Sequence, residues 1–406
     1  MRIEPSIPAP TRTAADQLGT LREVVEALAP LRRRAGSEVE QQAAEWIAAR
    51  LERAGASAHV EPEQFYDGYA PQLLPLAVAG VAAGVVALRG RRLMPAAIAA
   101  AASAAIVDDA SNGPRLWRKL VAAKRPTWNV VAETGDRDGA TTLVVLAHHD
   151  AAPTGHVFDQ SFQKWLGRRF PKLIARTDTS LPVWWPVAGG PALVAAGAAA
   201  GARRLLAVGT ALSGLTVALG AEIARSDVVP GANDNLSAVA ALVALAERLS
   251  VAPVPGMRVL LVSCGAEEVV QGGIYGFAAR HFPALDPRRT FCLNLDTIGS
   301  PELIMVEGEG PFRMERYPGA DFRDLIAAAA RRTGKPLRRG LLARSSTDAV
   351  IPARAGYPTA TFASWEPASK VLSNYHLMSD TPENLDYGTI ARAVTIIHAV
   401  VEDLAG

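Results

Sequence analysis

Along most of the chain, segments with apolar residues at helical spacing alternate with short apolar runs that are typical of strands. Residues 14–54 carry leucines and valines at helical spacing in two stretches, the second of which opens with Ser37 as N-cap and Glu40 in the capping-box position. Later elements keep the alternation, with strands at 57–65, 258–264, 291–296 and 359–364 and helices at 272–281, 321–333 and 388–404. This order predicts an α/β fold in which helices flank a mixed, largely parallel central sheet.

Two neighbouring runs of strand-forming residues predict a β-hairpin. NVVAE at 129–133 and TTLVVLA at 141–147 are separated by a Gly-Asp-Arg-Asp-Gly turn. Short apolar runs joined by such a turn commonly pair with each other. We therefore expect these two strands to be adjacent in the sheet.

Two apolar islands interrupt this pattern. The first consists of charge-free segments at 73–88 and 93–107, and the second of segments at 181–202 and 205–221, with arginines between the halves of each island. Such paired segments are typical of Ala-rich helical hairpins. The predicted organisation is a tail at 1–19, an α/β domain built from 20–66, 113–180 and 226–406, and inserted hairpins at 67–112 and 181–225.

Residues that can bind a metal stand where the apolar runs end. Five of them lie in separate segments: His148, Asp234, Glu268, Asp296 and His376. Because the carboxyl ends of parallel strands meet at one edge of a sheet, these groups can converge there. Two imidazoles and three carboxylates suit zinc, cobalt or manganese, and the lack of thiolates argues against a closed structural zinc site.

Five ligands are too many for one tetrahedral ion with an open position, so we expect two ions. His148 and Asp296 would hold one ion, Glu268 and His376 the other, and Asp234 would bridge them. A pair of divalent ions can activate water and polarise a carbonyl oxygen.

Three further acids complete the expected site. Adjacent residues at a strand end point in different directions, so Glu267 could face the water and act as a general base while its neighbour binds metal. Asp150 could accept the free ring N–H of His148, and Asp380 could do the same for His376. Each feature alone has a simpler explanation: Asp234, for example, could cap the following helix. The hypothesis rests on all of them occurring in order along one sheet.

Five segments together resemble a known family. AHHD, GANDNLSA, GAEE, NLDTIG and YHLMSDTPENLD are similar to motifs of the zinc-dependent M28 peptidases, which include bacterial aminopeptidases with two co-catalytic zinc ions. The resemblance covers 20–66, 126–155 and 226–404. It implies the same ligands, with Glu267 as general base and Asp150 as partner of His148.

The sequence also departs from that family. Ala238 stands where the family usually has glycine, and Ser346, Thr347 and Asp348 stand where many members have Ser-Asp-His, near the substrate wall. His149 and His156 flank the first motif, and either could approach the substrate or be an ordinary loop residue.

These features predict a zinc-dependent exopeptidase of the aminopeptidase type that hydrolyses peptide bonds with two zinc ions. One alternative is a glutaminyl-cyclase-like transferase with a single zinc. Another is a non-catalytic membrane scaffold built on a peptidase fold. Nucleic acid is not an expected partner, because 42 basic residues are balanced by 40 acidic ones. Cys264 and Cys292, in predicted buried strands, are expected to be reduced core residues.

The islands leave two locations open. As transmembrane hairpins they would give four spans, although 73–88 would reach only about 24 Å as a helix against a ~30 Å hydrocarbon core. As soluble helices they would form a cap or a dimer surface in a cytoplasmic protein. We favour the membrane, because a domain with a complete core has little room to hide four charge-free segments.

Basic residues suggest how such a protein would be oriented. Arginines mark the hairpin tips: Arg89, Arg91, Arg92, Arg203 and Arg204. More basic residues lie on the other side: Arg115, Arg118, Lys119, Lys124, Arg125, Arg168, Arg169, Lys172 and Arg176. The positive-inside rule and an N-terminus without an apolar signal-peptide core favour a cytoplasmic α/β domain. The segment 156–180 is expected near the site entrance, where it could restrict access to short peptides.

Overall fold

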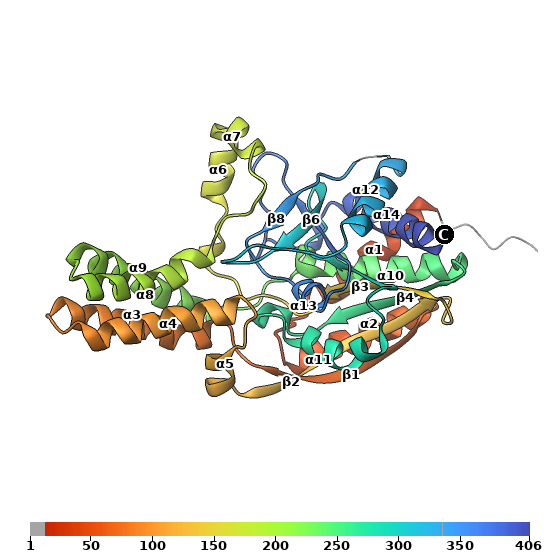
Figure 1. Ribbon diagram of the computed structural model, residues 1–406. Helices are drawn as coiled ribbons and strands as arrows, with labels where there is room; N and C mark the ends of the chain where they lie inside the picture. The colour runs from red at the N-terminus through yellow and green to blue at the C-terminus, as the bar shows by residue number, and fades with distance from the viewer. Residues whose placement is uncertain (1–12, 335) are drawn as a thin grey trace, which may run out of the picture.

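The computed structural model describes residues 13–334 and 336–406, and a nine-stranded mixed sheet forms their centre (Figure 1). The strand order is β1-β2-β4-β3-β5-β9-β6-β7, and β8 pairs with β6 beside this path. The strands are β1 (Ser57–Tyr66), β2 (Lys124–Gly135), β3 (Thr141–His148), β4 (Met257–Cys264), β5 (Thr290–Leu295), β6 (Glu302–Glu309), β7 (Glu315–Arg316), β8 (Leu341–Ala343) and β9 (Thr359–Trp365).

The middle of the sheet is parallel, as the sequence predicts. β3 pairs in parallel with β4 and β5, and β5 pairs in parallel with β9. In this register His148, the last residue of β3, lies opposite Cys264, the last residue of β4. The polar segments that follow these strands therefore start from the same edge of the sheet.

The prediction that β2 and β3 pair as a hairpin is wrong. β4 lies between the two strands, antiparallel to β2 and parallel to β3. The turn binds the start of β4 instead: the Asp136 N–H donates to the carbonyl of Met257, and the Asp136 carboxylate accepts the N–H of Gly256. Since almost every residue of β4 is buried, this strand is stable only with a neighbour on each side.

Helices cover both faces of the sheet. On one face, Leu143, Val145 and Ala147 of β3 join a core cluster with helices that include α1 (Ala14–Leu28), α2 (Glu38–Arg53), α10 (Ser237–Val251), α12 (Ala320–Arg332) and α14 (Tyr387–Ala405). The alternate residues Val144 and Leu146 pack on the other face, against the side of α11 (Gly272–His281) and α13 (Val350–Arg354). Cys264 and Cys292 are free and buried in this core, as predicted.

Two differences from the predicted elements have clear causes. β6 was not predicted, because two glutamates interrupt its apolar pattern: Glu307 is held by Arg339, and Glu309 accepts hydrogen bonds from Thr347. Helix α1 begins at Ala14 behind a Thr13 capping box, so the expected boundary at residue 19 falls inside a helix. The rest of the expected tail lies outside the described residues.

The two islands fold into four helices that form one bundle. These are α3 (Ala70–Leu88), α4 (Leu93–Ala110), α8 (Trp184–Ala200) and α9 (Arg203–Ile223). The bundle projects from the α/β body, with its tips farthest from the sheet (Figure 1). Its contacts are close: an added Cβ on Gly84 would meet the hydroxyl of Thr210, and one on Gly209 would meet the backbone of α8.

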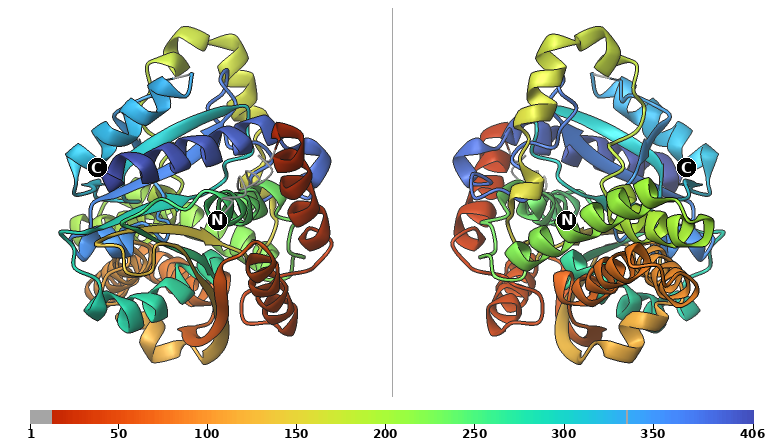
Figure 2. Two further views of the ribbon diagram at one scale, coloured as in Figure 1. Left: turned by 90° about the vertical axis from the view of Figure 1, so that its right-hand side faces the viewer. Right: turned by 90° about the vertical axis from the view of Figure 1, so that its left-hand side faces the viewer.

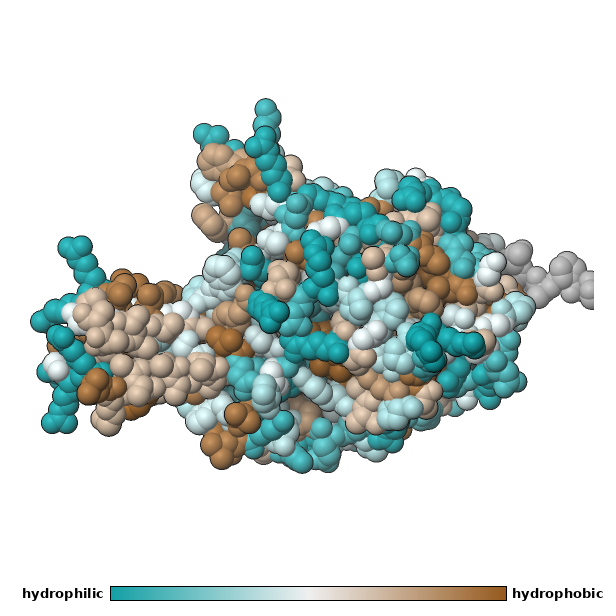
Figure 3. All heavy atoms as spheres, in the orientation of Figure 1, coloured by the Kyte–Doolittle hydropathy of each residue, from teal (hydrophilic) through white to brown (hydrophobic). Residues whose placement is uncertain are grey.

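The bundle is apolar on the outside. Val78, Val85, Ile98 and Val208 are among its exposed side chains, whereas alanines and glycines fill much of its interior. Figure 3 shows this brown surface ending in hydrophilic side chains at the tips. Among the described residues, three helices are long and apolar enough to cross a membrane: α3, α4 and α9.

Shorter helices lie around the root of the bundle. α5 (Leu116–Val121) lies on one side, and an arm formed by α6 (Ser161–Arg169) and α7 (Pro171–Ala175) stands on the opposite side (Figure 2, right). The remaining short helical turns are η1 (His156–Phe158), η2 (Ala232–Leu236), η3 (Glu267–Val269), η4 (Phe282–Ala284) and η5 (Pro382–Asn384). Arg118 of α5 secures the first hairpin, because it is buried and donates to both oxygens of Asp109 at the end of α4.

Candidate metal centre

The five predicted ligands meet at the carboxyl edge of the parallel strands. His148 ends β3, Glu268 lies in η3 just after β4, and Asp296 directly follows β5. Asp234 lies in η2 at the start of α10, and His376 comes from the loop before α14. The sheet register thus brings together residues that are up to 228 positions apart in the chain.

Asp234 occupies the middle of the cluster. Its Oδ1 lies 3.2 Å from Nε2 of His148, and its Oδ2 lies 3.2 Å from Nε2 of His376. Glu268 Oε2 is also 3.2 Å from that nitrogen of His376. Carboxylate and imidazole atoms fall into groups within 4.8 Å of one another: His148, Asp234 and Asp296 in one, and Asp234, Glu268 and His376 in another.

A third group of the same kind contains His148, Glu267 and Glu268. Glu267 therefore lies at the cluster as well, with its Oε2 4.0 Å from Nε2 of His148. The prediction that the two glutamates end an extended strand is wrong. They lie in the turn η3, which follows Ala266 in the left-handed region at φ 53°.

The donor set fits divalent cations. Both ring nitrogens of His376, Oδ2 of Asp234 and Oε1 of Glu268 are buried without a hydrogen-bond partner among the described residues. Buried charged groups without partners are costly, so atoms that converge in this way suit a bound cation. Nitrogen and oxygen ligands without thiolates match zinc in an open, catalytic site.

Charge is unevenly distributed in this cluster. Burial raises the pKa of Asp296 to about 7, and the carboxylate of Asp234 adds to this shift. Burial also raises the pKa of Glu267 well above its usual range, although His148 opposes the effect. The carboxylates of Glu268 and Asp234 overcome the effect of burial on His376 and raise its pKa to about 10. Burial is the main cause of the higher pKa of Asp296 and Glu267, and neighbouring carboxylates add to it; positive charge nearby would oppose all three shifts.

Asp150 supports both glutamates. Its two oxygens accept the backbone N–H groups of Glu267 and Glu268, each at 3.0 Å. Oδ1 also lies 3.4 Å from Nδ1 of His148, on the side of the ring that faces away from Asp234. Asp150 therefore fixes the backbone that follows β4, whereas Nδ1 of His148 has no hydrogen-bond partner among the described residues, so the pairing of Asp150 with that ring stays a prediction.

Asp380 has a different role from the one predicted. It is not hydrogen-bonded to His376, whose Nδ1 has no partner in the described part of the chain. Instead its oxygens accept the backbone N–H groups of Asn233 at 2.7 Å and Asp234 at 3.0 Å. Asp380 thus holds the loop that carries the central ligand, because that loop leaves N–H groups unpaired at the start of α10.

The two flanking histidines do not line the site. His149 is fully buried, with Nδ1 2.9 Å from the Ser263 hydroxyl, and burial lowers its pKa to about 4. His156 is exposed and bound to Glu222. From the 346–348 segment, Ser346 reaches the cavity described below, whereas Asp348 is buried and burial raises its pKa to about 7.

Sequence reasoning missed Arg33, which ties the ligand loops together. Its guanidinium is buried and donates to the carbonyls of His149 and Pro230, next to the first and second ligand segments. It also donates to the carbonyl of Leu28 at the end of α1. A run of three arginines at 32–34 was the available signal, but nothing in that run distinguishes the buried one.

A second missed group holds Glu267. Gln271 donates from Nε2 to Oε1 of Glu267 at 2.8 Å and to the carbonyl of Ser346. Asn112, just beyond the first hairpin, donates to Oε1 of Gln271 at 2.7 Å. Val270 and Gln271 both have positive φ, 70° and 55°, a costly conformation for a β-branched residue. The inserted hairpin is thus linked to the candidate base through two hydrogen bonds.

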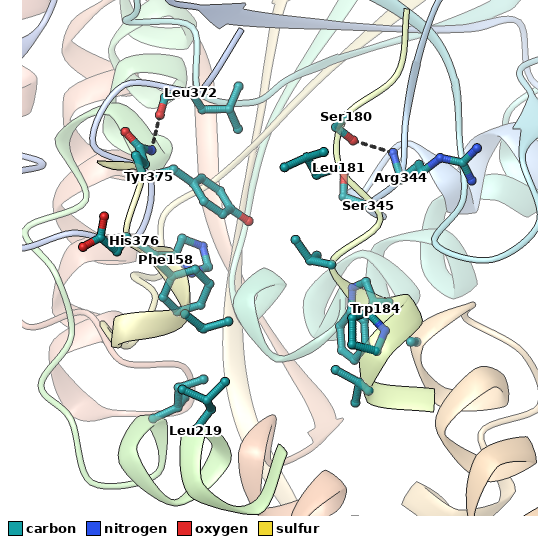
Figure 4. Close-up of a pocket in the computed structure, with 18 of the residues that line it drawn as sticks. Phe158, Ser180, Leu181, Trp184, Leu219, Arg344, Ser345, Leu372, Tyr375 and His376 are labelled. Atoms are coloured by element: carbon teal, nitrogen blue, oxygen red, sulfur yellow. Dashed lines mark hydrogen bonds between the residues drawn. The ribbon is translucent and has the colours of Figure 1, made fainter. Parts of the chain in front are cut away.

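A chamber of about 660 Å³ opens onto the cluster. Glu267, Glu268 and His376 contribute to its wall, together with Phe158 and Tyr375 (Figure 4). The aromatic rings of these two residues pack on His376 with centroid distances of 4.3 and 3.9 Å. The segment 156–180 therefore lies at the site, as predicted, and α3 and α9 of the bundle also line the chamber.

The sequence model of peptidase family M28 matches residues 216–401, which include four of the five clustered ligands. The matched segment is just under half of the chain and is similar to that family. No curated protein matches the chain.

Several solved structures share the fold of this chain. An aminopeptidase from an Aneurinibacillus species is 16% identical, with a TM-score of 0.57 over 95% of this chain and 93% of that one. A Zn-dependent exopeptidase from Parabacteroides distasonis is 14% identical, with a TM-score of 0.55 over 97% and 99% of the two chains. A glutaminyl cyclase from Tannerella forsythia is 16% identical, with the same TM-score and coverage. These likenesses show the fold, which hosts both kinds of protein.

We expect an Arg33→Met variant to be less stable by about 3 kcal/mol, because several buried carbonyls lose a charged donor at once. Its thermal unfolding midpoint, followed by tryptophan fluorescence, should fall by several degrees. Arg34→Met is the matched control: Arg34 is exposed and donates to the carbonyl of Ser226, so a change within about 0.5 kcal/mol is expected. Equal midpoints for the two variants would contradict the bracing role of Arg33.

Proposed function

We propose that the protein is a zinc-dependent exopeptidase of the aminopeptidase type. The observation that carries this proposal is the pair of ligand groups that share Asp234, set beside Glu267 at the wall of a chamber. The match of residues 216–401 to the model of the peptidase family and the fold shared with zinc exopeptidases support it.

The five clustered side chains would hold the metal: His148 and Asp296 on one ion, Glu268 and His376 on the other, and Asp234 between them. Bound zinc would supply a Lewis acid for the amide carbonyl and a lower pKa for water. Asp150 fixes the backbone of both glutamates and would orient the ring of His148, whose Nδ1 lies 3.4 Å from its Oδ1. Asp380 fixes the backbone of the bridging residue.

Glu267 is the proposed general base. It takes a proton from the attacking water and delivers it to the nitrogen of the leaving amine. Gln271 donates to Oε1 and leaves Oε2 as the oxygen nearer the ligands. Clustered carboxylates would also attract the protonated α-amine of a peptide, which favours cleavage next to a free N-terminus.

We expect Glu267→Gln to lower kcat by about 10²- to 10⁴-fold while the chain keeps its metal, because the amide cannot accept the proton. Aminoacyl-coumarin hydrolysis and the metal content of the same preparation are the two measurements. Glu383→Gln provides the matched control, since Glu383 is exposed outside the chamber. Full hydrolytic activity in the Glu267 variant would refute the assignment of the base.

We expect about two zinc ions per chain in the wild type, fewer than one in Asp234→Ala, and about one in His376→Ala. Asp234 belongs to two ligand groups, one with His148 and Asp296 and the other with Glu268 and His376, so its loss would weaken both metal positions. His376 belongs only to the second group, so its loss would weaken one. Metal content after dialysis, measured by mass spectrometry, tests this. Equal loss in the two variants would contradict a shared ligand.

The same measurement separates the rival function. A glutaminyl-cyclase-like transferase would need a single ion, and the fold is shared with such enzymes. One ion per chain, unaffected by removal of His148 or Asp296, would favour that reading. A non-catalytic scaffold would show neither bound metal nor hydrolysis.

We also propose that the hairpins 67–112 and 181–225 are insertions into the α/β domain and that they cross a membrane. Three of the four helices meet the length and hydropathy expected of a span, and α8, with 17 residues, would extend about 25 Å. Small residues inside the bundle and larger apolar residues outside it are also the arrangement of helices packed in lipid.

A ring of exposed side chains around the bundle root supports this proposal. Phe162, Trp165 and Leu173 of the arm are exposed on one side, and Leu116 and Leu120 of α5 on the other. The helices that carry both groups lie near the root of the bundle, where a bilayer surface would meet the α/β body (Figure 1). Basic residues accompany them in both places: Lys119, Lys124, Arg168, Arg169 and Lys172. Aromatic and basic residues at this level are typical of a cytoplasmic membrane interface.

We expect the full chain to sediment with membranes, to resist extraction by alkaline carbonate and to become soluble in detergent. The exposed apolar surface of the bundle would otherwise face water. A peripheral membrane protein that carbonate releases is the control. Recovery of the chain in the soluble fraction without detergent would favour the alternative of a soluble cytoplasmic protein.

A further inference from the structure

The chamber has two chemically different ends. Glu267, Glu268 and His376 lie at one end. At the other end the wall is formed by aliphatic side chains of the inserted helices: Leu73, Leu74, Leu212, Leu215, Leu219 and Ile223. Figure 4 shows Leu219 on α9 on the bundle side of Phe158 and His376, with Trp184 across the cavity.

Most polar groups near the aliphatic end already have partners. The Thr216 hydroxyl donates to the carbonyl of Leu212 within α9. Gln160 lies farther off, where it donates to the carbonyl of Leu372; its Oε1 is buried without a partner among the described residues. This end therefore offers a ligand dispersion contacts and removal from water, and little recognition by charge.

We propose that this part of the chamber binds a linear alkyl chain carried by the amide substrate. The inference rests on the proposed function, because the amide must lie at the carboxylate end while its chain extends toward α3 and α9. A volume of about 660 Å³ is in the range of small-molecule sites and leaves room beyond an ordinary amino-acid side chain.

The position of the chamber explains why the chain should be long. α3 and α9, which supply the aliphatic wall, are two of the candidate membrane spans. Gln163 and Leu166 of the arm, whose aromatic residues are exposed at the bundle root, supply another part of the wall. The cavity thus joins the catalytic carboxylates to the expected bilayer surface, where amphiphilic amides accumulate. The chain could be attached to the acyl residue of the substrate or to its leaving amine.

The test uses the full chain in nanodiscs, loaded with zinc. One substrate series varies a straight side chain on an aminoacyl-coumarin, from alanine to 2-aminodecanoic acid. The other series varies the leaving group in alanine n-alkylamides, from ethyl to octyl. In one of the two series kcat/KM should rise by up to about fourfold for each methylene until the chamber is filled, and the series that responds identifies the point of attachment.

Variants distinguish the chamber from a general effect of the bundle. Leu219→Gln should lower the ratio of kcat/KM for the eight-carbon substrate to kcat/KM for the alanine substrate by at least about tenfold. Leu205→Gln makes the same change on the same helix at a residue outside the chamber and should alter neither value. Leu219→Trp should shorten the preferred chain by occupying the cavity.

A second measurement keeps the inference separate from the proposed activity. Butylamine, hexylamine and octylamine are titrated calorimetrically into the protein, with empty nanodiscs as the blank. Affinity that rises with chain length and is lost in Leu219→Gln supports the chamber even if no amide is hydrolysed, in which case only the proposed function fails. A flat dependence on chain length in this titration and in both substrate series would overturn the inference.

Discussion

The structure depends on the parallel pairing of β3 with β4 and β5. These three strands are buried on both faces and end at one edge of the sheet, so the segments that follow them must turn outward at the same place. His148, Glu268 and Asp296 are brought together by this register alone. Asp234 and His376 then enter from loops and complete a buried cluster of carboxylates and imidazoles that could hold metal ions.

A second set of buried side chains holds the loops that carry the clustered residues. The carboxylates of Asp150 and Asp380 accept hydrogen bonds from backbone N–H groups of the ligand segments, and the guanidinium of Arg33 donates to carbonyls of these segments. Two buried aspartates and one buried arginine thus neutralise loop dipoles while they fix the loops. Other groups hold two residues with positive φ: the Glu40 carboxylate accepts the N–H of Ala266, and Asn112 donates to the side chain of Gln271.

The inserted hairpins are more than an appendage to this site. Arg118 and Asn112 bind the first hairpin to the α/β body, and Asn112 reaches Gln271, which holds Glu267. From the other side, α9 contributes the aliphatic wall of the chamber. The hairpins, which we propose to cross a membrane, would then both anchor the chain and shape the space beside Glu267.

Local patterns in the sequence determined the fold class and the identity of the clustered residues. Helical spacing places α2, α11 and α14, apolar runs place β3, β4 and β5, and each run ends in the residue type that a metal needs. Tertiary structure decided which strands are neighbours, because pairing is a long-range choice: β4 separates β2 from β3 although the turn between them looks local. It also decided which polar residues serve the site. His149 has the same side chain as His148, and Arg33 the same as Arg32 and Arg34, so the residue type does not show which of them serves the site. The direction of each side chain decides this, and it is set by packing between segments far apart in the chain. The chamber could not be predicted for the same reason, since its two ends come from the body and from the insertions, and no stretch of sequence contains both.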